Sequence, residues 1–335
     1  MNAPEQVPPP VSRPTASLSL DLDNAWSYMK TRGDSGWASF PSYLDVAVPR
    51  FLELFDQLGV RVTVFIVGQD AALPESRAVL RSIAQAGHEI GNHSFHHEPW
   101  LGSYDADKVD EEIGSAHAAI ADATGVAPRG FRGPGYSLSR ATLEALVRRN
   151  YAYDASTFPT YIGPLARAYY FMTARLSSEE REQRDALFGT LADGLRPLRP
   201  YLWDLDGHSL VEMPVTTFPV LKVPIHFSYV LYLATRSTPA AIAYFRAALA
   251  ACRAFGIGPS LLLHPLDLLD ATDAPQLAFF PAMGLPRERK RAVLMRALHA
   301  LTGAFDVVSV GEHARRAGES PGVRTRPWET VPASA

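Results

Sequence analysis

The chain has 335 residues, of which 47% are hydrophobic and 20% are charged, and its formal net charge is −3. This composition is typical of a globular protein with enough apolar side chains for one large α/β domain or two small ones. A nearly balanced charge creates no field that attracts a polyanion, so no nucleic-acid partner is expected. We expect a small or neutral substrate.

Nothing in the sequence indicates export or membrane insertion. The single cysteine, Cys252, excludes an internal disulfide, and its apolar helical neighbours predict a buried thiol. Residues 1–16 lack the basic start and apolar core of a secretory signal. The apolar runs at 227–234 and 259–263 are far shorter than the roughly 20 residues of a membrane-spanning helix. We therefore expect a cytoplasmic protein without a transmembrane segment.

Strand-like and helix-like segments alternate along the first half of the chain. Residues 1–16 hold five prolines and are expected to form a disordered tail. The hydrophobic pattern then predicts strands at 17–22, 60–67, 88–91, 129–132 and 151–155, and helices at 42–58, 74–86, 105–124 and 139–149. Repeated strand–helix units indicate a mainly parallel sheet that forms a barrel or is covered by helices.

The alternation stops after residue 158. We interpret residues 160–237 as an insertion, with a helix at 178–195 and a strand at 211–215. Helices at 239–255 and 287–301 and strands at 259–264 and 305–308 follow it. About seven repeats result, so the predicted fold is a single (β/α)7-type barrel domain over residues 17–317, with a flexible tail at 318–335.

Two aspartates end the first predicted strand. Asp21 and Asp23 stand two residues apart at its carboxyl end, where the active sites of parallel α/β folds gather. On an extended chain this spacing puts both carboxylates on one face. Taken alone, the pair is more typical of a solvated strand end.

Three histidines follow another predicted strand. His93 and His97 would project side by side from one helical turn and bind one metal ion, whereas the alternative pair of His93 and His96 leaves His97 unexplained. Two imidazoles and one carboxylate with open coordination positions suit a catalytic zinc or a similar divalent ion. One aspartate would then neutralise the charge of the metal while the other serves as a base.

Two more strand ends carry polar residues. Arg132 precedes the tight turn Gly133–Tyr136, whose outward backbone N–H groups are suited to receive an oxyanion. Arg132 is placed to pair with Asp21 and keep it ionised. His264 ends an apolar strand and is the candidate general acid that protonates a leaving amine.

Together these motifs resemble the NodB-like polysaccharide deacetylases, a carbohydrate esterase family with a distorted (β/α) barrel. The resemblance covers residues 18–154 and 261–310, and its most specific part is the His-Ser-x-x-His segment from His93 to His97. One departure is that Leu22 separates two aspartates that are adjacent in most members. The resemblance includes a subgroup with Asp-x-Asp, whose members act on peptidoglycan sugars, cyclic amides or formyl groups.

The resemblance implies a role for each motif residue. Asp21 would be the base, Asp23, His93 and His97 the metal ligands, Arg132 the residue that orients the base, His264 the acid, and the backbone at Gly135 and Tyr136 part of the oxyanion site.

We therefore predict a metal-dependent hydrolase that removes an acetyl or formyl group from the nitrogen of a sugar. Zinc is the expected metal, with cobalt, nickel, iron or manganese compatible with the same ligands. The expected location favours a nucleotide-linked or lipid-linked intermediate of glycan biosynthesis as substrate. The alternatives are an amidase for a cyclic imide or ureide and a non-catalytic carbohydrate-binding barrel. The sequence does not define the oligomeric state.

Several apolar and aromatic residues are candidates for contact with the substrate. Trp26, Trp37 and Tyr136 are candidates for stacking on a sugar ring. A predicted helix also carries an apolar stripe, formed by Leu187, Phe188, Leu191 and Leu195. This stripe either packs on its own domain or, together with the aromatic residues Phe227, Tyr229 and Tyr232, contacts lipid or a lipid-linked substrate.

Overall fold

Strands and helices alternate along the chain in a computed structural model that describes residues 13–163 and 191–328. The strands are β1 (Thr15–Leu22), β2 (Thr63–Ile66), β3 (Glu89–Asn92), β4 (Gly130–Phe131), β5 (Tyr153–Asp154), β6 (Tyr201–Leu205), β7 (His208–Glu212), β8 (Ser260–Leu263), β9 (Asp306–Val308) and β10 (Arg324–Pro327). The helices are α1 (Ala25–Arg32), α2 (Leu44–Leu58), α3 (Gly68–Ala72), α4 (Arg77–Gln85), α5 (Ala106–Thr124), α6 (Arg140–Arg148), α9 (Phe227–Ala234), α10 (Thr238–Ala254), α11 (Arg287–Ala304) and α12 (Val310–Gly318).

These strands form one sheet in the order β10-β6-β7-β5-β4-β3-β2-β1-β8, with β9 beside β1. Every pairing among them is parallel except that of β6 with β7. Beyond β7, Thr216 N donates to Ser260 O at 2.9 Å and Ser260 N donates to Thr216 Oγ1 at 2.8 Å, so the chain after β7 lies against β8. The predicted α/β fold with a mostly parallel sheet is confirmed.

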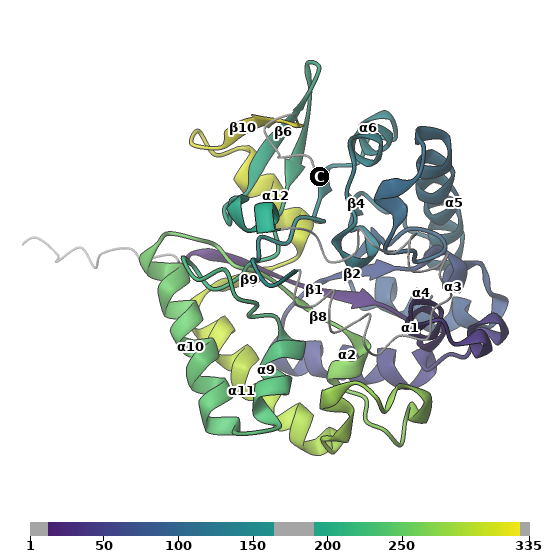
Figure 1. Cartoon of the computed structure of the whole chain (residues 1–335), viewed down its shortest axis with the longest axis vertical. Helices are drawn as coiled ribbons and strands as arrows, with labels where there is room; N and C mark the ends of the chain where they lie inside the picture. The colour runs from purple at the N-terminus through teal and green to yellow at the C-terminus, as the bar shows by residue number, and fades with distance from the viewer. Residues whose placement is uncertain (1–12, 164–190, 329–335) are drawn as a thin grey trace, which may run out of the picture.

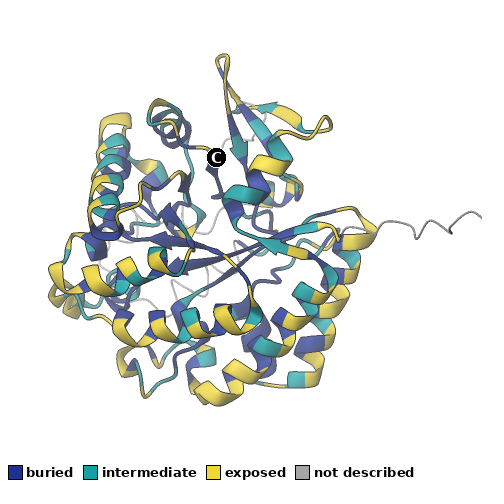
Figure 2. Cartoon of the chain, turned by 180° about the vertical axis from the view of Figure 1, so that it is seen from behind, coloured by how far each residue is buried: buried dark blue, intermediate teal, exposed yellow. Residues whose placement is uncertain are grey.

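Helices cover the outside of this sheet. Neighbouring helices contact one another in the order α6, α5, α4, α2, α11, α10 and α9 (Figure 1). The central strands are buried, while the helices expose the sides that face away from the sheet (Figure 2). Helices packed around a parallel sheet leave the carboxyl ends of the strands, with the loops that follow them, as the place for a site.

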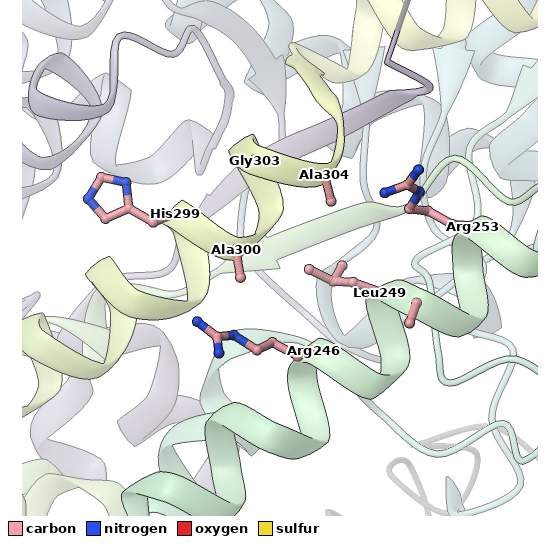
Figure 3. A pocket seen from close by; sticks show the side chains of 8 residues that line it. Arg246, Leu249, Arg253, His299, Ala300, Gly303 and Ala304 are labelled. Carbon is pink, nitrogen blue, oxygen red and sulfur yellow. The ribbon is translucent and has the colours of Figure 1, made fainter. Parts of the chain in front are cut away.

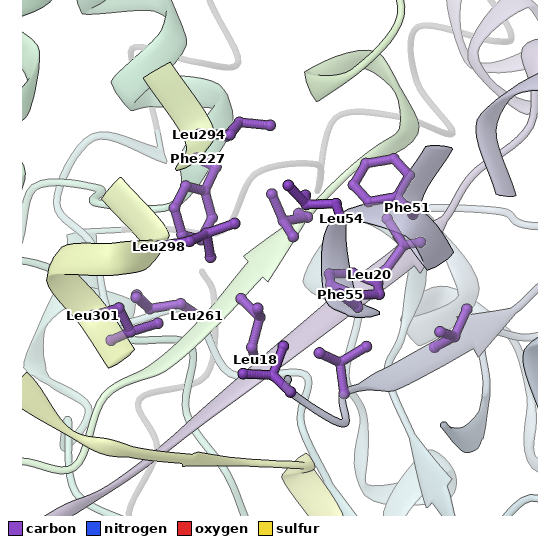
Figure 4. Packing of buried hydrophobic residues seen from close by; sticks show 14 of the residues in the cluster. Leu18, Leu20, Phe51, Leu54, Phe55, Phe227, Leu261, Leu294, Leu298 and Leu301 are labelled. Carbon is purple, nitrogen blue, oxygen red and sulfur yellow. The ribbon is translucent and has the colours of Figure 1, made fainter. Parts of the chain in front are cut away.

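Strand β1 shows how the sheet separates the apolar core from the polar side. Leu20 packs with Phe55 of α2 in a large cluster of buried apolar residues (Figure 4). Ser19 and Asp21, at the alternate positions of the strand, lie on the opposite face, where both accept hydrogen bonds from Arg132. Because alternate side chains of a strand point to opposite faces, one strand supplies both the core and the polar side.

The carboxyl-terminal region differs from the flexible tail that the sequence predicts. Residues 318–335 were expected to form a flexible tail, but Arg324–Pro327 forms β10, which pairs with β6. Trp328 follows it and packs on Trp203 with ring centroids 5.4 Å apart. This edge strand carries no apolar periodicity, so its pairing depends on a partner more than 100 residues away.

Other differences lie in and around the predicted insertion. The strand expected at 211–215 lies at His208–Glu212, because its hairpin with β6 sets the register. The helix expected at 178–195 falls mostly outside the described residues, and its described end, Leu191–Leu195, is a short 3-10 helix. Helices α1, α3, α9 and α12 were not predicted.

The structure also bears on the predicted lipid contact. Leu187 and Phe188 lie outside the described residues. Leu191, Leu195 and Tyr232 expose half or more of their surfaces, whereas Phe227 is fully buried in the main core. None of the described helices is both long enough and apolar enough to cross a membrane. Contact with lipid stays a prediction.

Candidate active site

Asp23, His93 and His97 converge after the carboxyl ends of β1 and β3. Asp23 Oδ1 lies 3.2 Å from His93 Nε2 and 3.0 Å from His97 Nε2. All three residues are buried, and one potential ligand atom from each lies within 4.8 Å of the others. The imidazoles of His97 and His93 outweigh the effect of burial and hold the pKa of the Asp23 carboxyl well below its usual range. The three predicted metal ligands are thus side by side.

The hydrogen bonds of His93 show how this cluster suits a cation. His93 Nδ1 lies 2.6 Å from the carbonyl oxygen of Arg132, which can only accept, so Nδ1 carries a proton. The lone pair of Nε2 then faces the ionised Asp23 carboxylate. Two acceptors this close require a cation or a further proton between them, and a backbone carbonyl on the far nitrogen is the usual way in which a metal-binding histidine is oriented.

The loop that carries the histidines is not the predicted helical turn. Residues 93–97 are irregular, with positive φ values at Ser94 (61°) and His97 (50°), so a bend brings the two imidazoles together. His96 points elsewhere and hydrogen-bonds Glu112 of α5. Buried Glu112 also accepts the backbone N–H groups of Phe95 (3.2 Å) and His96 (3.0 Å), so it holds the loop in shape.

Asp21 and Arg132 form a buried ion pair beside this cluster. Arg132 Nη1 donates to Asp21 Oδ1 at 2.7 Å and to Ser19 Oγ at 2.8 Å, and Arg132 Nε donates to Ala155 O at 2.9 Å. The guanidinium also lies over the ring of Phe65, 4.5 Å from its centroid. Arg132 is therefore fixed on several sides and presents its charge to Asp21, as the sequence predicted.

A pair of buried carboxyl groups supports the segment behind Arg132. Asp154 and Glu212 face each other across β5 and β7. Burial raises the pKa of both carboxyl groups, and the nearby Asp154 raises that of Glu212 further, so the pair retains a proton to higher pH than isolated carboxyl groups do. Asp154 in turn accepts from Ser156 Oγ at 2.6 Å, and Ser156 Oγ accepts from Gly133 N at 2.8 Å. This network fixes the start of the turn after Arg132.

The turn Gly133–Tyr136 differs from the predicted oxyanion site in one respect. The backbone N–H of Tyr136 donates to Gly133 O at 3.0 Å, so it is already engaged in this conformation. Gly135 has a φ of 58°, and a Cβ there would lie 2.9 Å from Cβ of Pro99. The sharp bend therefore requires glycine, but an oxyanion would have to compete for the Tyr136 amide.

His264 lies at the end of β8 in a hydrogen-bonded chain. Its Nδ1 is 3.1 Å from Ser228 Oγ, which donates to Asp267 Oδ1 at 2.8 Å. Asp267 also accepts from His264 N at 2.9 Å. Ser228 was not predicted from the sequence, because it lies 36 residues before His264 and is brought to it by α9; Asp267 was not predicted either. With Nδ1 bound, Nε2 is the nitrogen that remains for a ligand.

Two residues near Asp23 were also missed. Asn24 caps α1 by accepting from Ala25 N at 2.8 Å, and its amide donates to Asp70 Oδ1 at 2.8 Å. Trp26 Nε1 donates to the same oxygen at 2.8 Å. Trp26 is only 1% exposed, so the prediction that it stacks on a sugar is wrong. Its apolar helix position and the buried carboxylate of Asp70 hold its indole in the interior.

A separate groove of about 490 Å³ lies between α10 and α11 (Figure 3). Arg246, Arg253 and His299 are among the residues that line it. None of the candidate site residues takes part in it, and its polar groups lie on exposed helix faces. It is therefore not part of this site.

Comparison with known proteins is consistent with this geometry. Residues 33–153 match the model of the polysaccharide deacetylase family, which covers His93, His97 and Arg132 and leaves the two aspartates and His264 outside. The peptidoglycan deacetylase of Helicobacter pylori is 31% identical over 112 residues, which are 33% of this chain and 37% of that protein. The chain spans between 30% and 47% of the three curated relatives that it matches.

Two solved structures show the same fold. A probable polysaccharide deacetylase from Pseudomonas aeruginosa PAO1 superimposes with a TM-score of 0.61 at 17% identity, over 92% of this chain and 93% of that chain. The Puue allantoinase superimposes with a TM-score of 0.56 at 15% identity, over 96% of this chain and 95% of that chain. At these identities the likeness concerns the fold alone.

Proposed function

Because the chain belongs to the polysaccharide deacetylase family through residues 33–153, we propose that it is a metal-dependent hydrolase that removes an N-acyl group from a sugar. The observation that carries this proposal is the convergence of Asp23, His93 and His97, with ligand atoms within 4.8 Å of one another, beside the buried pair of Asp21 and Arg132. With His264, which follows β8 beside β1, these groups would supply what amide hydrolysis needs: a metal site, a base and an acid.

We assign a role to each of these residues. A divalent ion held by Asp23, His93 and His97 would polarise the acyl carbonyl and lower the pKa of a bound water. Asp21, oriented by Arg132, accepts a proton from the attacking water. His264 donates a proton from Nε2 to the leaving nitrogen as the C–N bond breaks. The products are a carboxylate and a free amino sugar.

The finer details of the proposal are the metal, the acyl group and the sugar. We propose zinc, because nitrogen and carboxylate ligands with open positions suit it. We propose acetyl or formyl as the acyl group, and a nucleotide-linked or lipid-linked sugar in the cytoplasm as its carrier. Cell fractionation and a panel of N-acyl sugars, with a cyclic ureide included, would test these choices.

The first experiment is metal content by plasma mass spectrometry on purified wild-type protein and on His93→Ala, His97→Ala and His299→Ala. His299 is exposed on α11 and serves as the matched control. We expect about one ion per chain in the wild type and in His299→Ala, and its loss from the other two variants. Acetate and formate release from the sugar panel should follow the metal. A protein that takes up no metal under any loading condition would refute the proposal.

A further inference from the structure

One buried histidine near the site takes part in none of the roles assigned above. His226 immediately precedes α9 and is only 5% exposed. Its Nδ1 is sealed from solvent without a hydrogen-bond partner. No protein partner is found for Nε2 among the described residues either, but that atom is not sealed in the same way. Nε2 is therefore the one nitrogen of this buried imidazole at which water or a ligand can supply a hydrogen-bond partner.

The surroundings of His226 place it at the candidate active site. Its ring centroid lies 5.8 Å from that of His264 and 5.8 Å from that of Phe158. Tyr229 packs edge-on against it with centroids 4.7 Å apart, and Tyr136 packs on Phe158 at 4.5 Å. We call Tyr136, Phe158, His226 and Tyr229 the aromatic wall. Its members other than His226 are partly exposed, as is His264.

The charge state of His226 follows from its neighbours. Burial lowers its pKa well below the usual value, and electrostatic interaction with His264 and Arg132 lowers it further. A neutral imidazole carries one N–H and one lone pair. Because a sealed N–H without a partner is rarer and costlier than a sealed acceptor, the proton belongs on Nε2. His226 then offers a single neutral donor to the site.

We infer that His226 binds the amine-bearing half of the substrate, by donating from Nε2 to a hydroxyl of the sugar ring near the scissile amide, while Phe158 and Tyr229 pack against the sugar. This inference rests on the proposed function. His226 adjoins His264, the residue assigned to the leaving nitrogen, so the group it meets is on the sugar and not on the acyl carbon. Alternating aromatic and hydrogen-bonding side chains suit a sugar ring, which has apolar faces and polar edges.

The test compares His226→Phe and His226→Gln with the wild type on methyl N-acetylglucosaminide and on its 3-deoxy and 4-deoxy analogues. We expect His226→Phe to raise KM for the parent sugar about 10-fold, the loss expected for one hydrogen bond, and to change kcat less than threefold. For the analogue that lacks the contacted hydroxyl, His226→Phe and the wild type should have the same KM. His226→Gln retains a donor and should restore at least part of the affinity.

Metal content and the melting temperature of each variant provide the controls, and calorimetric titration with glucosamine gives a readout that does not depend on turnover. Equal effects of His226→Phe on all three sugars would overturn the inference and leave the proposed function intact. A kcat loss above 1000-fold with unchanged KM would also overturn it, because His226 would then act in proton transfer. A wild-type protein that binds metal but hydrolyses no N-acyl sugar would refute the proposed function and this inference together.

Discussion

Arg132 Nη1 lies 2.7 Å from Asp21 Oδ1, and the two side chains are only 1% and 4% exposed. Removing one partner of such a pair leaves an uncompensated buried charge, which costs about 3–5 kcal/mol. We therefore expect Arg132→Met and Asp21→Asn each to lower the free energy of unfolding by an amount of that order. The double variant should lose much less than the sum of the two.

Urea denaturation of the metal-free protein would measure this coupling. Arg77 and Asp122 form a matched control, because their side chains are 44% and 63% exposed. Arg77→Met should cost no more than about 1 kcal/mol. Additive losses at Arg132 and Asp21 would show that the pair is not coupled in the folded state.

Glu112 is expected to govern metal affinity although it is not a predicted ligand. It accepts hydrogen bonds from two backbone N–H groups and is hydrogen-bonded to the His96 side chain, and so holds the loop between His93 and His97, the two histidines proposed to bind the metal. Residues that orient metal ligands typically change the affinity by about 10–100-fold. Competition with a chromogenic chelator should show a weakening of that size for Glu112→Gln, with one ion still bound at saturation. An unchanged affinity would mean that the loop keeps its shape without this carboxylate.

Ser228 is expected to affect turnover more than substrate binding. It joins His264 Nδ1 to Asp267 and thereby fixes the orientation of the ring, whose Nε2 is the atom proposed to donate the proton. Ser228→Ala should lower kcat about 10-fold and leave KM within a factor of two, the pattern of an interaction made mainly in the transition state. Ser228→Thr retains the hydroxyl and should restore most of the rate. A change in KM alone would assign Ser228 to substrate binding instead.

The buried carboxyl of Asp70 is expected to make the stability of the metal-free protein depend on pH. Burial raises the pKa of its carboxyl to about 7, despite hydrogen bonds from Asn24 and Trp26 that favour the ionised form. Its contribution to stability is therefore complete below the unfolded value near 3.8 and is lost as the pH rises through about 7. The total loss is on the order of 4 kcal/mol, from about 1.4 kcal/mol per unit of pKa.

Asp70→Asn cannot ionise and serves as the reference. Denaturant titrations from pH 4 to pH 8 in the presence of a chelator should show the wild type losing stability relative to this variant, with most of the change between pH 4 and pH 7. A constant difference over that range would show that Asp70 titrates normally in the folded protein. A wild type that instead gains stability relative to Asp70→Asn as the pH rises would contradict the direction of the pKa shift.

The sequence by itself determined the features that depend on local pattern. The period-two alternation of β1 placed Asp21 on one face and the core leucines on the other, because successive side chains of a strand point in opposite directions. Long amphipathic helices such as α2 and α5 were predicted to within a few residues. The residue types at the strand ends identified Asp23, His93 and His97, which the structure brings together. Their functional roles stay predictions.

Only the tertiary structure decided the features that depend on distant partners. The positive φ at His97, the pairing of β10 with β6 and the burial of Trp26 against Asp70 each depend on contacts that leave no periodic signal in the sequence. The same holds for Ser228 and His226, which a segment outside the recognised motifs carries to the end of β8. Hydrophobic patterning specifies which face of an element is buried, but packing selects which remote side chain meets a polar group there.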